Sequence, residues 1–368
     1  MSGKYKDELG LIVMNNCKEF GEKIDKNIMG KRNREESFII PTDVVRFNNG
    51  EGKVVIKDTV RDKDLYILSD VGNHSETYDM YGYKNHKSPD DHYQDIKRVI
   101  SAIRGQADRI TVVMPLLYQS RQHRRKGRES LDCALALQEL QNLGVDTIVT
   151  FDVHDPDIQN AVPTSMSFEN FYPTNTILKQ FIRNESFNPE DVVFISPDTG
   201  AMDRARYYAN MFQADVGMFH KRRDLSKIVD GKNPIVAHEY LGRDLNGKTG
   251  IVVDDMIASG GSILEVAEDL KQRGAKKVYL ISTFSMFTNG LDAFNKAYNE
   301  GLFDSLYSTN LTYVDQNVIP KPWYKLIDCS NYASDIIDTL NSSGSVSNLK
   351  NGKQKILNML DKKKKGEL

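Results

Sequence analysis

Short apolar runs alternate with amphipathic stretches along most of this 368-residue chain. The apolar runs are rich in β-branched residues, as expected of strands that are buried on both faces of a parallel sheet. They occupy Leu11–Met14, Leu65–Leu68, Ile110–Met114, Thr147–Phe151, Val192–Ile195, Ile251–Val253 and Val278–Thr283. Helical periodicity occupies Tyr93–Arg104, Leu131–Leu143, Arg204–Phe212, Ile263–Arg273 and Leu291–Asn299. The alternation predicts an α/β fold of βαβ units, with mainly parallel sheets flanked by helices.

Polar residues gather where several of the predicted strands end. In sheets of this kind, ligands bind beyond the C-terminal ends of the strands. The residues at these ends are Asp152 and His154, Asp198, and the pair Asp254 and Asp255. We therefore expect the chemistry of the chain at the carboxyl edges of its sheets.

The segment after the run Ile251–Val253 is the most specific of these. Asp254 and Asp255 are followed by a loop of small residues and then by a helical pattern. In the loop, Ser259–Ser262 leave room for backbone N–H groups to converge at the positive end of the helix, which predicts a phosphate cradle. The two acids are placed to hydrogen-bond sugar hydroxyls, and no Lys-Ser/Thr pair follows the glycines as in the usual nucleoside-triphosphatase loop. The alternative is an ordinary strand–turn–helix connection with chance acids.

Length and composition narrow the class of protein. A chain of 368 residues exceeds one usual core, which predicts two domains. The 49 basic and 51 acidic residues nearly balance and argue against a nucleic-acid partner. The three cysteines form no CxxC and predict neither a disulfide framework nor a zinc site. No run of membrane-spanning length and no signal-peptide core is found, so we expect a cytoplasmic enzyme without a membrane partner.

Two clusters suit anionic ligands. Five basic side chains lie within eight residues in the segment Arg121–Arg128, directly after a predicted strand. They indicate an anion pocket in which arginine can grip phosphates, although a solvated basic surface is the common alternative. Lys221–Arg223 begins a charged segment, where two cations could close over a reacting polyphosphate or form a plain surface patch.

Two strand-end residues suit a metal or a nucleotide. Asp198 precedes a small-residue turn and suits magnesium, which is bound through few carboxylates together with phosphate oxygens. His154 follows Asp152 by two residues, and on an extended segment both side chains would point to the same side. His154 could ligate a metal, hydrogen-bond a nucleotide, or be a structural histidine.

Three segments lack clear periodicity and are expected to be flexible. Asn73–Asp91 is predicted to be a long surface insertion, and His220–Gly242 a mobile active-site loop. The tail after Gly344 ends in a run of lysines, which predicts a solvated basic segment.

Taken in order, six motifs resemble those of the ribose-phosphate diphosphokinase family, the enzymes that make phosphoribosyl pyrophosphate. The resemblance covers roughly residues 10 to 350, and the C-terminal segment Gly344–Leu349 shares it. The motifs are Arg46–Glu51, Arg121–Arg124 with Arg128 and Glu129, Asp152–Gln159, Ser196–Gly200, Lys221–Arg223 and Asp254–Ser262.

The resemblance implies two phosphoribosyltransferase-like α/β domains, with the active site between them and at a subunit interface. We expect an N-terminal domain at 1–172 on the ATP side, a C-terminal domain at 173–345 on the ribose-5-phosphate side, and a basic tail at 346–368. The implied ATP-binding residues are Phe47, Asn49, Glu51, Arg121, Gln122 and His154, with Phe47 stacked on the adenine from a neighbouring subunit. The implied ribose-5-phosphate residues are Asp198, Asp254, Asp255, Ala258, Ser259, Gly260, Gly261 and Ser262. Lys221 and Arg223 are the implied catalytic cations, and His154 and Asp198 the implied ligands of Mg²⁺.

The implied activity is transfer of the β,γ-diphosphate of ATP to the 1-hydroxyl of ribose 5-phosphate, which gives 5-phosphoribosyl 1-diphosphate and AMP. The implied assembly is a homo-oligomer built from dimers, of which a hexamer is one form. The chain departs from the family pattern at Asn49 and His123, where Asp is usual, and at Ala258, where many members carry Asp. Two alternatives stay open at this point: a phosphoribosyltransferase that consumes the product, and a non-catalytic regulatory homologue.

Overall fold

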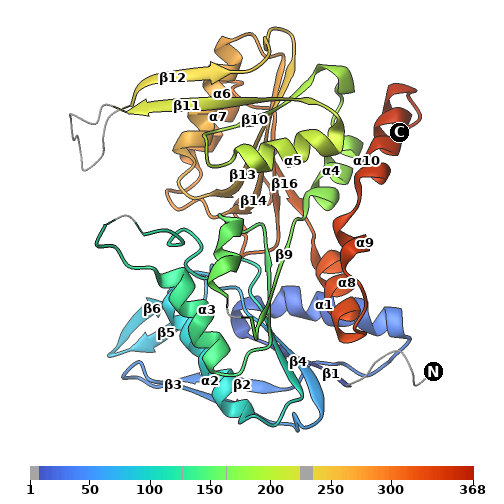
Figure 1. Cartoon of the computed structure of the whole chain (residues 1–368). Coiled ribbons are helices and arrows are strands. Elements are labelled where there is room, and N and C mark those ends of the chain that lie inside the picture. The colour runs from blue at the N-terminus through green and yellow to red at the C-terminus, as the bar shows by residue number, and fades with distance from the viewer. Residues whose placement is uncertain (1–7, 126, 163, 224–234) are drawn as a thin grey trace. The chain divides into compact units, whose positions relative to one another are not determined.

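The computed structural model describes residues 8–125, 127–162, 164–223 and 235–368, with the backbone alone at 221–223 and 235–238. The chain groups into two compact units (Figure 1). The first unit contains Met1–Pro173, Asn310–Tyr313 and Asp328–Asn351, and the second contains Thr174–Thr309, Val314–Ile327 and Gly352–Leu368. This grouping differs from the linear division expected from the sequence, because Asp328–Asn351 returns to the first unit.

The first unit is built on a five-stranded sheet of order β1-β4-β7-β8-β9, in which every neighbouring pair is parallel. Its strands are β1 (Glu8–Val13), β4 (Lys63–Leu68), β7 (Arg109–Val113), β8 (Thr147–Phe151) and β9 (Ser167–Phe171). Its helices are α1 (Lys18–Arg32), α2 (Pro89–Ile103), α3 (Asp132–Asn142), α8 (Ser330–Asn341) and the short α9 (Ser347–Lys350). Two antiparallel hairpins complete the unit: β2 (Thr42–Arg46) with β3 (Gly52–Ile56), and β5 (Thr77–Met80) with β6 (Tyr83–His86).

Both faces of this sheet are covered by helices. Alternate strand residues such as Ile12, Ile67 and Val112 join one buried cluster with apolar residues of α2 and α3. On the strands the intervening positions, such as Leu11 and Tyr66, are also fully buried, and α1 packs against both β1 and α8. Because both faces are buried, the strands are continuous apolar runs rather than alternating ones, which is why the sequence predicts them well.

The second unit contains a seven-stranded sheet of order β12-β11-β10-β13-β14-β15-β16. All of its pairs are parallel except β11 with β12, which are antiparallel. The strands are β10 (Val192–Ser196), β11 (Asp215–Arg223), β12 (Ile235–Leu241), β13 (Thr249–Ile257), β14 (Lys277–Ser285), β15 (Ser305–Thr309) and β16 (Tyr324–Ile327). The helices are α4 (Thr174–Asn184), α5 (Met202–Phe212), α6 (Gly261–Gln272), α7 (Asp292–Asn299) and α10 (Lys353–Lys364). Together the two sheets confirm the predicted α/β class.

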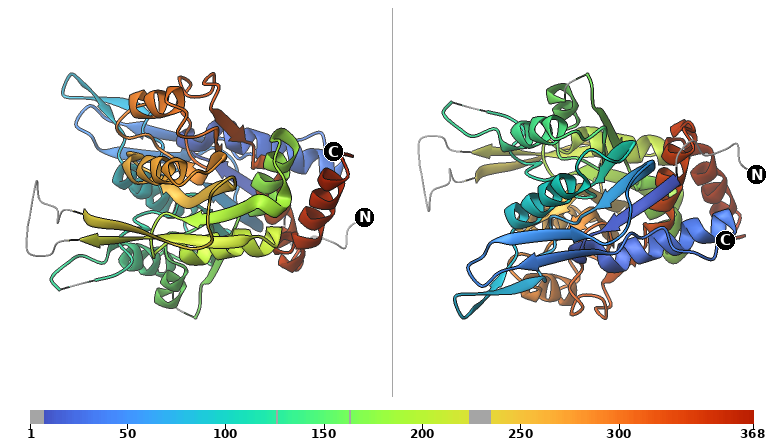
Figure 2. Two further views of the ribbon diagram at one scale, coloured as in Figure 1. Left: turned by 90° about the horizontal axis from the view of Figure 1, so that it is seen from above. Right: turned by 90° about the horizontal axis from the view of Figure 1, so that it is seen from below.

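Strands β11 and β12 run side by side as a long two-stranded arm (Figure 2). The sequence predicts a mobile loop at His220–Gly242, but both ends of this segment are strand. Residues 224–234 of the expected loop lie outside the described residues. The arm continues the sheet from β10, because β11 pairs with β10 through Asp215–Met218.

The C-terminal segment also differs from the expected solvated tail. Ile356 and Leu360, one helical turn apart, are buried on one face of α10, which packs against α4 and α5 (Figure 1). The lysines occupy its last turn, where cations favourably oppose the helix dipole. Among the described residues, none of the helices is long and apolar enough to cross a membrane.

A buried carboxylate, Asp70, fastens the segment Asn310–Tyr313 to the end of β4. It accepts hydrogen bonds from the Thr312 hydroxyl at 3.0 Å, the Tyr313 N–H at 2.6 Å and the Gly72 N–H at 3.0 Å. Burial nevertheless raises the pKa of Asp70 to about 6, although these hydrogen bonds act in the opposite direction.

We therefore expect the substitution Asp70→Asn to change how stability depends on pH. Because the folded pKa lies above the unfolded one, Asp70 contributes stability that is fully present below about pH 4 and is lost as the pH rises through about 6. The variant lacks this titration, so its free energy of unfolding should rise relative to the unsubstituted chain by about 2–3 kcal/mol between about pH 4 and 7. Urea unfolding across this range measures the difference, and a difference independent of pH would contradict the assignment.

Candidate functional site

The first group of predicted site residues lies in the turn between β2 and β3. The Phe47 N–H donates to the Glu51 carbonyl at 2.8 Å, and the Gly50 N–H donates to the Phe47 carbonyl at 2.8 Å. The Asn49 amide donates to the Glu51 carboxylate at 3.0 Å and accepts from the Glu51 N–H at 3.1 Å. Asn49 and Glu51 therefore form one hydrogen-bonded pair, and Phe47 beside them is 48% exposed. The turn presents an aromatic face together with an amide and a carboxylate.

The second group lies in the basic loop between β7 and α3. Arg121 and Gln122 are exposed, while His123 and Arg124 both contact the carboxylate of Asp155. The His123 Nε2 lies 3.0 Å from Asp155 Oδ2, and the Arg124 Nη2 lies 2.7 Å from the same oxygen. Burial acts to raise the pKa of Asp155, but the N–H of Asp157 and the charges of Arg124 and His123 outweigh it and lower the pKa. Asp155 is thus an ionised anchor that ties the basic loop to the end of β8.

His154 lies beside this anchor. Its ring meets that of His123 edge-on, with the centroids 5.4 Å apart. His154 and Asp152 do not lie on one extended segment with their side chains on the same side, so that prediction is wrong. Asp152 has a φ of 42°, so the segment is not extended there. Asp152 is buried, whereas His154 is exposed and faces solvent beside the basic loop.

In the second unit, Asp198 begins the turn between β10 and α5. Its Oδ1 accepts hydrogen bonds from the Gly200 N–H at 2.8 Å and the Ala201 N–H at 3.1 Å. The Ser196 hydroxyl also donates to the Asp198 carbonyl at 2.6 Å. These bonds orient an exposed carboxylate at the carboxyl end of β10.

Asp254 and Asp255 lie within β13 rather than after it, because this strand continues to Ile257. Asp255 is buried, and its Oδ1 lies 3.7 Å from the guanidinium of Arg204 on α5. Asp254 is half-buried, and its Oδ1 accepts the Asp255 N–H at 2.9 Å. Burial, and then the neighbouring Asp255 carboxylate, raise the pKa of Asp254 well above its ordinary value, against the opposing charge of Arg204. A carboxyl that keeps its proton can donate as well as accept hydrogen bonds, which suits sugar hydroxyls.

The predicted phosphate loop, Ala258–Ser262, leads directly into α6. Gly260 is the N-cap of this helix, and it has no side chain to cap the first turn. The first helical hydrogen bond runs from the Leu264 N–H to the Gly260 carbonyl. The N–H groups of the first turn therefore remain for an anion, at the end of the helix where the dipole favours negative charge. The Thr288 N–H fixes the loop by donating to the Ala258 carbonyl at 2.9 Å.

Gly260 has a φ of 88°, and a β-carbon at this position would lie only 2.3 Å from the ring of Phe294 on α7. Glycine is thus required both by the backbone conformation and by the ring behind it. At Gly261, by contrast, a β-carbon would meet nothing within 4 Å. One glycine of the loop is needed for the fold, and the other faces open space.

The predicted catalytic cations Lys221 and Arg223 lie at the end of β11. The backbone of Lys221 pairs with His238, and that of Arg223 with Ile235. Their side chains lie outside the described part of the chain, so their role stays a prediction.

Comparisons with known proteins agree with these features. A family model described as the N-terminal domain of ribose phosphate pyrophosphokinase matches residues 9–144, and a phosphoribosyl transferase domain model matches residues 173–292. The ribose-phosphate pyrophosphokinase of Mycoplasmopsis pulmonis is 30% identical over 311 residues, which cover 82% of this chain and 86% of the relative. The chain belongs to the ribose-phosphate pyrophosphokinase family.

Other members of the ribose-phosphate pyrophosphokinase family match over most of their length. Ribose-phosphate pyrophosphokinase A of Dictyostelium discoideum is 29% identical over 308 residues, which cover 83% of this chain and 88% of that protein. The crystal structure of phosphoribosylpyrophosphate synthetase from Mycobacterium smegmatis shares the fold, with a TM-score of 0.75 and 22% identity. It covers 92% of this chain and 100% of that one. These matches confirm two phosphoribosyltransferase-like domains.

Three contacts among the candidate site residues were not predicted from the sequence. Arg204 partners Asp255, the Phe294 ring supports Gly260, and Asp155 anchors the basic loop. Asp155 lies inside the motif Asp152–Gln159, and Arg204 follows the motif Ser196–Gly200 by four residues, so a search for charge partners in and beside those motifs could have suggested them. Nothing near Phe294 in the sequence signals its place behind the phosphate loop.

Proposed function

We propose that this chain is a ribose-phosphate diphosphokinase that acts on ATP and ribose 5-phosphate. The 1-hydroxyl oxygen of the sugar attacks the β-phosphorus of ATP, and the bond from that phosphorus to the oxygen shared with the α-phosphate breaks. AMP leaves with that oxygen, the hydroxyl proton is released, and the diphosphate stays on the sugar. The protein contributes little covalent chemistry to this reaction. It acts by positioning the two substrates and by stabilising the charge on the phosphates.

The ribose-5-phosphate half of the proposal is carried by the uncapped start of α6 together with the acids of β13. The 5-phosphate would accept hydrogen bonds from the first-turn N–H groups and from Ser259 and Ser262. Asp254 and Asp255 would then meet the sugar hydroxyls. The raised pKa of Asp254 supports this role, because the pair can hold a proton and so need not present two full negative charges to the sugar phosphate.

The ATP half of the proposal belongs to the first unit. Phe47 would stack on the base, and Asn49 and Glu51 would face its polar edge as one hydrogen-bonded pair. Arg121 and Gln122 would hold the nucleotide from the basic loop, which the contacts of Arg124 and His123 with Asp155 keep in place.

His154 and Asp198, the two Mg²⁺ ligands implied by the family resemblance, suit this ion. Within the described ranges, no group of three or more His, Cys, Asp or Glu side chains is arranged to hold a metal ion. Mg²⁺ commonly needs only one or two carboxylates, because substrate phosphates and water complete its shell. When bound, the ion would neutralise charge on the transferring phosphates. Asp198 offers an exposed carboxylate, already oriented by two backbone N–H groups, and His154 an exposed imidazole.

Two further parts of the proposal rest on the family resemblance. A homo-oligomer would let the β2–β3 turn of one subunit serve the site of a neighbour, and the cytoplasm would supply both substrates. Sedimentation of the full chain measures the first of these.

One assay separates the proposed activity from its alternatives. The full chain is incubated with ribose 5-phosphate, ATP and MgCl₂, and AMP is followed by chromatography; matched mixtures lack the sugar or the metal. We expect AMP only in the complete mixture. AMP formation that does not depend on ribose 5-phosphate would contradict the proposal. Turnover only with phosphoribosyl diphosphate and a nucleobase would instead identify a phosphoribosyltransferase, and nucleotide binding without turnover a regulatory homologue.

A further inference from the structure

The insertion at 73–91 forms a regular hairpin that contacts the proposed nucleotide turn. Its strands β5 and β6 are joined by the two-residue turn Tyr81-Gly82. The Tyr81 N–H donates to the carbonyl of Asn48, between Phe47 and Asn49, at 2.9 Å. The Met80 sulfur packs against Gly50, 2.7 Å from the position that a β-carbon would occupy there. The tip of one hairpin therefore holds the tip of the other.

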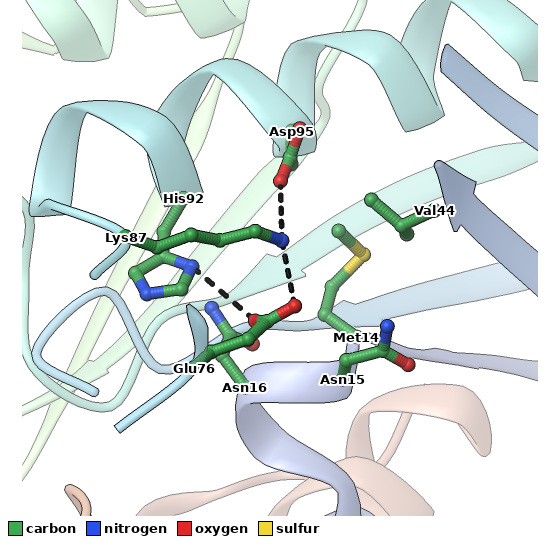
Figure 3. A pocket seen from close by; sticks show the side chains of 8 residues that line it. All are labelled: Met14, Asn15, Asn16, Val44, Glu76, Lys87, His92 and Asp95. Carbon is green, nitrogen blue, oxygen red and sulfur yellow. Dashed lines mark hydrogen bonds and ion pairs between the residues drawn. The ribbon is translucent and has the colours of Figure 1, made fainter. Parts of the chain in front are cut away.

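The root of the β5–β6 hairpin is joined to the turn end of β2 as well, through the buried carboxylate of Asp95 on α2. Arg46, the last residue of β2, reaches Asp95 Oδ1 at 3.2 Å. Lys87, directly after β6, reaches Asp95 Oδ2 at 3.1 Å and Glu76, directly before β5, at 2.6 Å (Figure 3). The Arg46 guanidinium also lies 5.3 Å from the centre of the Tyr78 ring on β5. The β5–β6 hairpin is therefore held at its tip and at its root against the turn end of the β2–β3 hairpin.

Tyr81 occupies its turn at a conformational cost. Tyr81 and Gly82 have φ values of 49° and 81°, as in a type I′ turn, where Asn-Gly is preferred. A bulky side chain with positive φ is strained, and such strain is typically retained where the residue serves a function. The Tyr81 ring is 75% exposed, so burial within the chain does not offset the cost.

We propose that the β5–β6 hairpin is a second nucleotide-recognition element of this chain. Its tip holds the turn that carries Phe47, Asn49 and Glu51, and it offers the Tyr81 ring as a further contact for the base of the nucleotide. The inference rests on the proposed function, because it assigns a ligand to that turn. It adds a residue from an insertion that lies outside the motifs of the family.

The test compares two equally exposed tyrosines of the same hairpin. Tyr81→Ala keeps the N–H that binds Asn48 but removes the ring, and Tyr83→Ala removes a ring that is also 75% exposed. Binding of a non-hydrolysable ATP analogue is measured by titration calorimetry on the full chain, together with KM for each substrate. We expect Tyr81→Ala to raise the Kd of the analogue and the KM for ATP about tenfold, as for loss of one aromatic–base contact. Tyr83→Ala, Tyr81→Phe and the KM for ribose 5-phosphate should stay within about twofold of the unsubstituted values.

Equal effects of the two alanine substitutions would overturn the inference. So would a change of oligomeric state in Tyr81→Ala with an unchanged Kd, which would identify a subunit contact instead. Because the Kd is read without turnover, a chain that binds the analogue but releases no AMP refutes the proposed activity and still tests the hairpin. Failure of the unsubstituted chain to bind the analogue overturns the inference together with the nucleotide site.

Discussion

Replacing Lys221 with alanine is expected to lower turnover by about 10²–10³-fold, with little change in the KM for ribose 5-phosphate. Diphosphate transfer spreads negative charge over the phosphate oxygens in the transition state, and the protein contributes mainly cations positioned to stabilise that charge. Lys221 lies near the end of β11, the strand beside β10 that leads into Asp198. An interaction made chiefly in the transition state lowers kcat when it is removed, whereas substrate binding changes little.

A matched control for Lys221 lies just beyond the end of the same strand pair. Arg243 follows β12 and forms an exposed ion pair with Asp215 at the start of β11, with a separation of 2.6 Å. Exposed pairs of this kind contribute little to stability, so Arg243→Ala should retain turnover close to that of the unsubstituted chain. Comparable turnover in both variants would show that Lys221 is not a catalytic residue.

The substitution Gly260→Ala is expected to have the largest effect on the predicted phosphate loop, Ala258–Ser262. The new β-carbon would lie 2.3 Å from the Phe294 ring, and the backbone φ of 88° is costly for any residue except glycine. Overpacking and backbone strain together should lower the free energy of unfolding by about 2–5 kcal/mol. Displacement of the loop should also weaken ribose-5-phosphate binding, because the first-turn N–H groups of α6 move with it. Urea unfolding and calorimetric titration with ribose 5-phosphate measure the two effects.

Gly261→Ala is the matched control, because a β-carbon at Gly261 meets nothing within 4 Å. This variant should fold with nearly unchanged stability. Its methyl group would extend into the open space where the phosphate is proposed to approach, so ribose-5-phosphate binding should weaken without a loss of stability. If Gly261→Ala bound ribose 5-phosphate normally, the phosphate would not lie against this part of the loop.

Sequence patterns predicted the buried strands of the fold but not its peripheral hairpin and C-terminal helix. The runs at Ile110–Met114 and Thr147–Phe151 became central strands because both faces of the sheet are covered. The β5–β6 hairpin was missed because its strands are largely polar and contain no buried residue, and its turn carries Tyr-Gly in place of a recognisable turn pair. Helix α10 was missed because its few apolar residues are hidden among lysines, and only their packing against α4 and α5 shows their role.

The candidate site was predictable where its residues are adjacent in the sequence. The loop before α6 could be predicted because its glycines, its serines and the boundary between strand and helix all lie within one short segment. Its support by Phe294 depends on how α7 returns to the loop, which no local pattern contains. The same holds for Arg204, whose pairing with Asp255 joins α5 to β13. Local chemistry could therefore be predicted, whereas contacts between distant segments needed the fold.

Phosphorus NMR of the complete reaction tests the proposed diphosphate transfer most directly. The full chain, ATP, ribose 5-phosphate and MgCl₂ are mixed, and the phosphorus resonances are followed as ATP is consumed. We expect AMP and a diphosphate ester at the sugar 1-position to appear in equal amounts. Formation of ADP with a single phosphate at the sugar 1-position, or of AMP with free diphosphate from the start, would contradict transfer of the β,γ-diphosphate to ribose 5-phosphate.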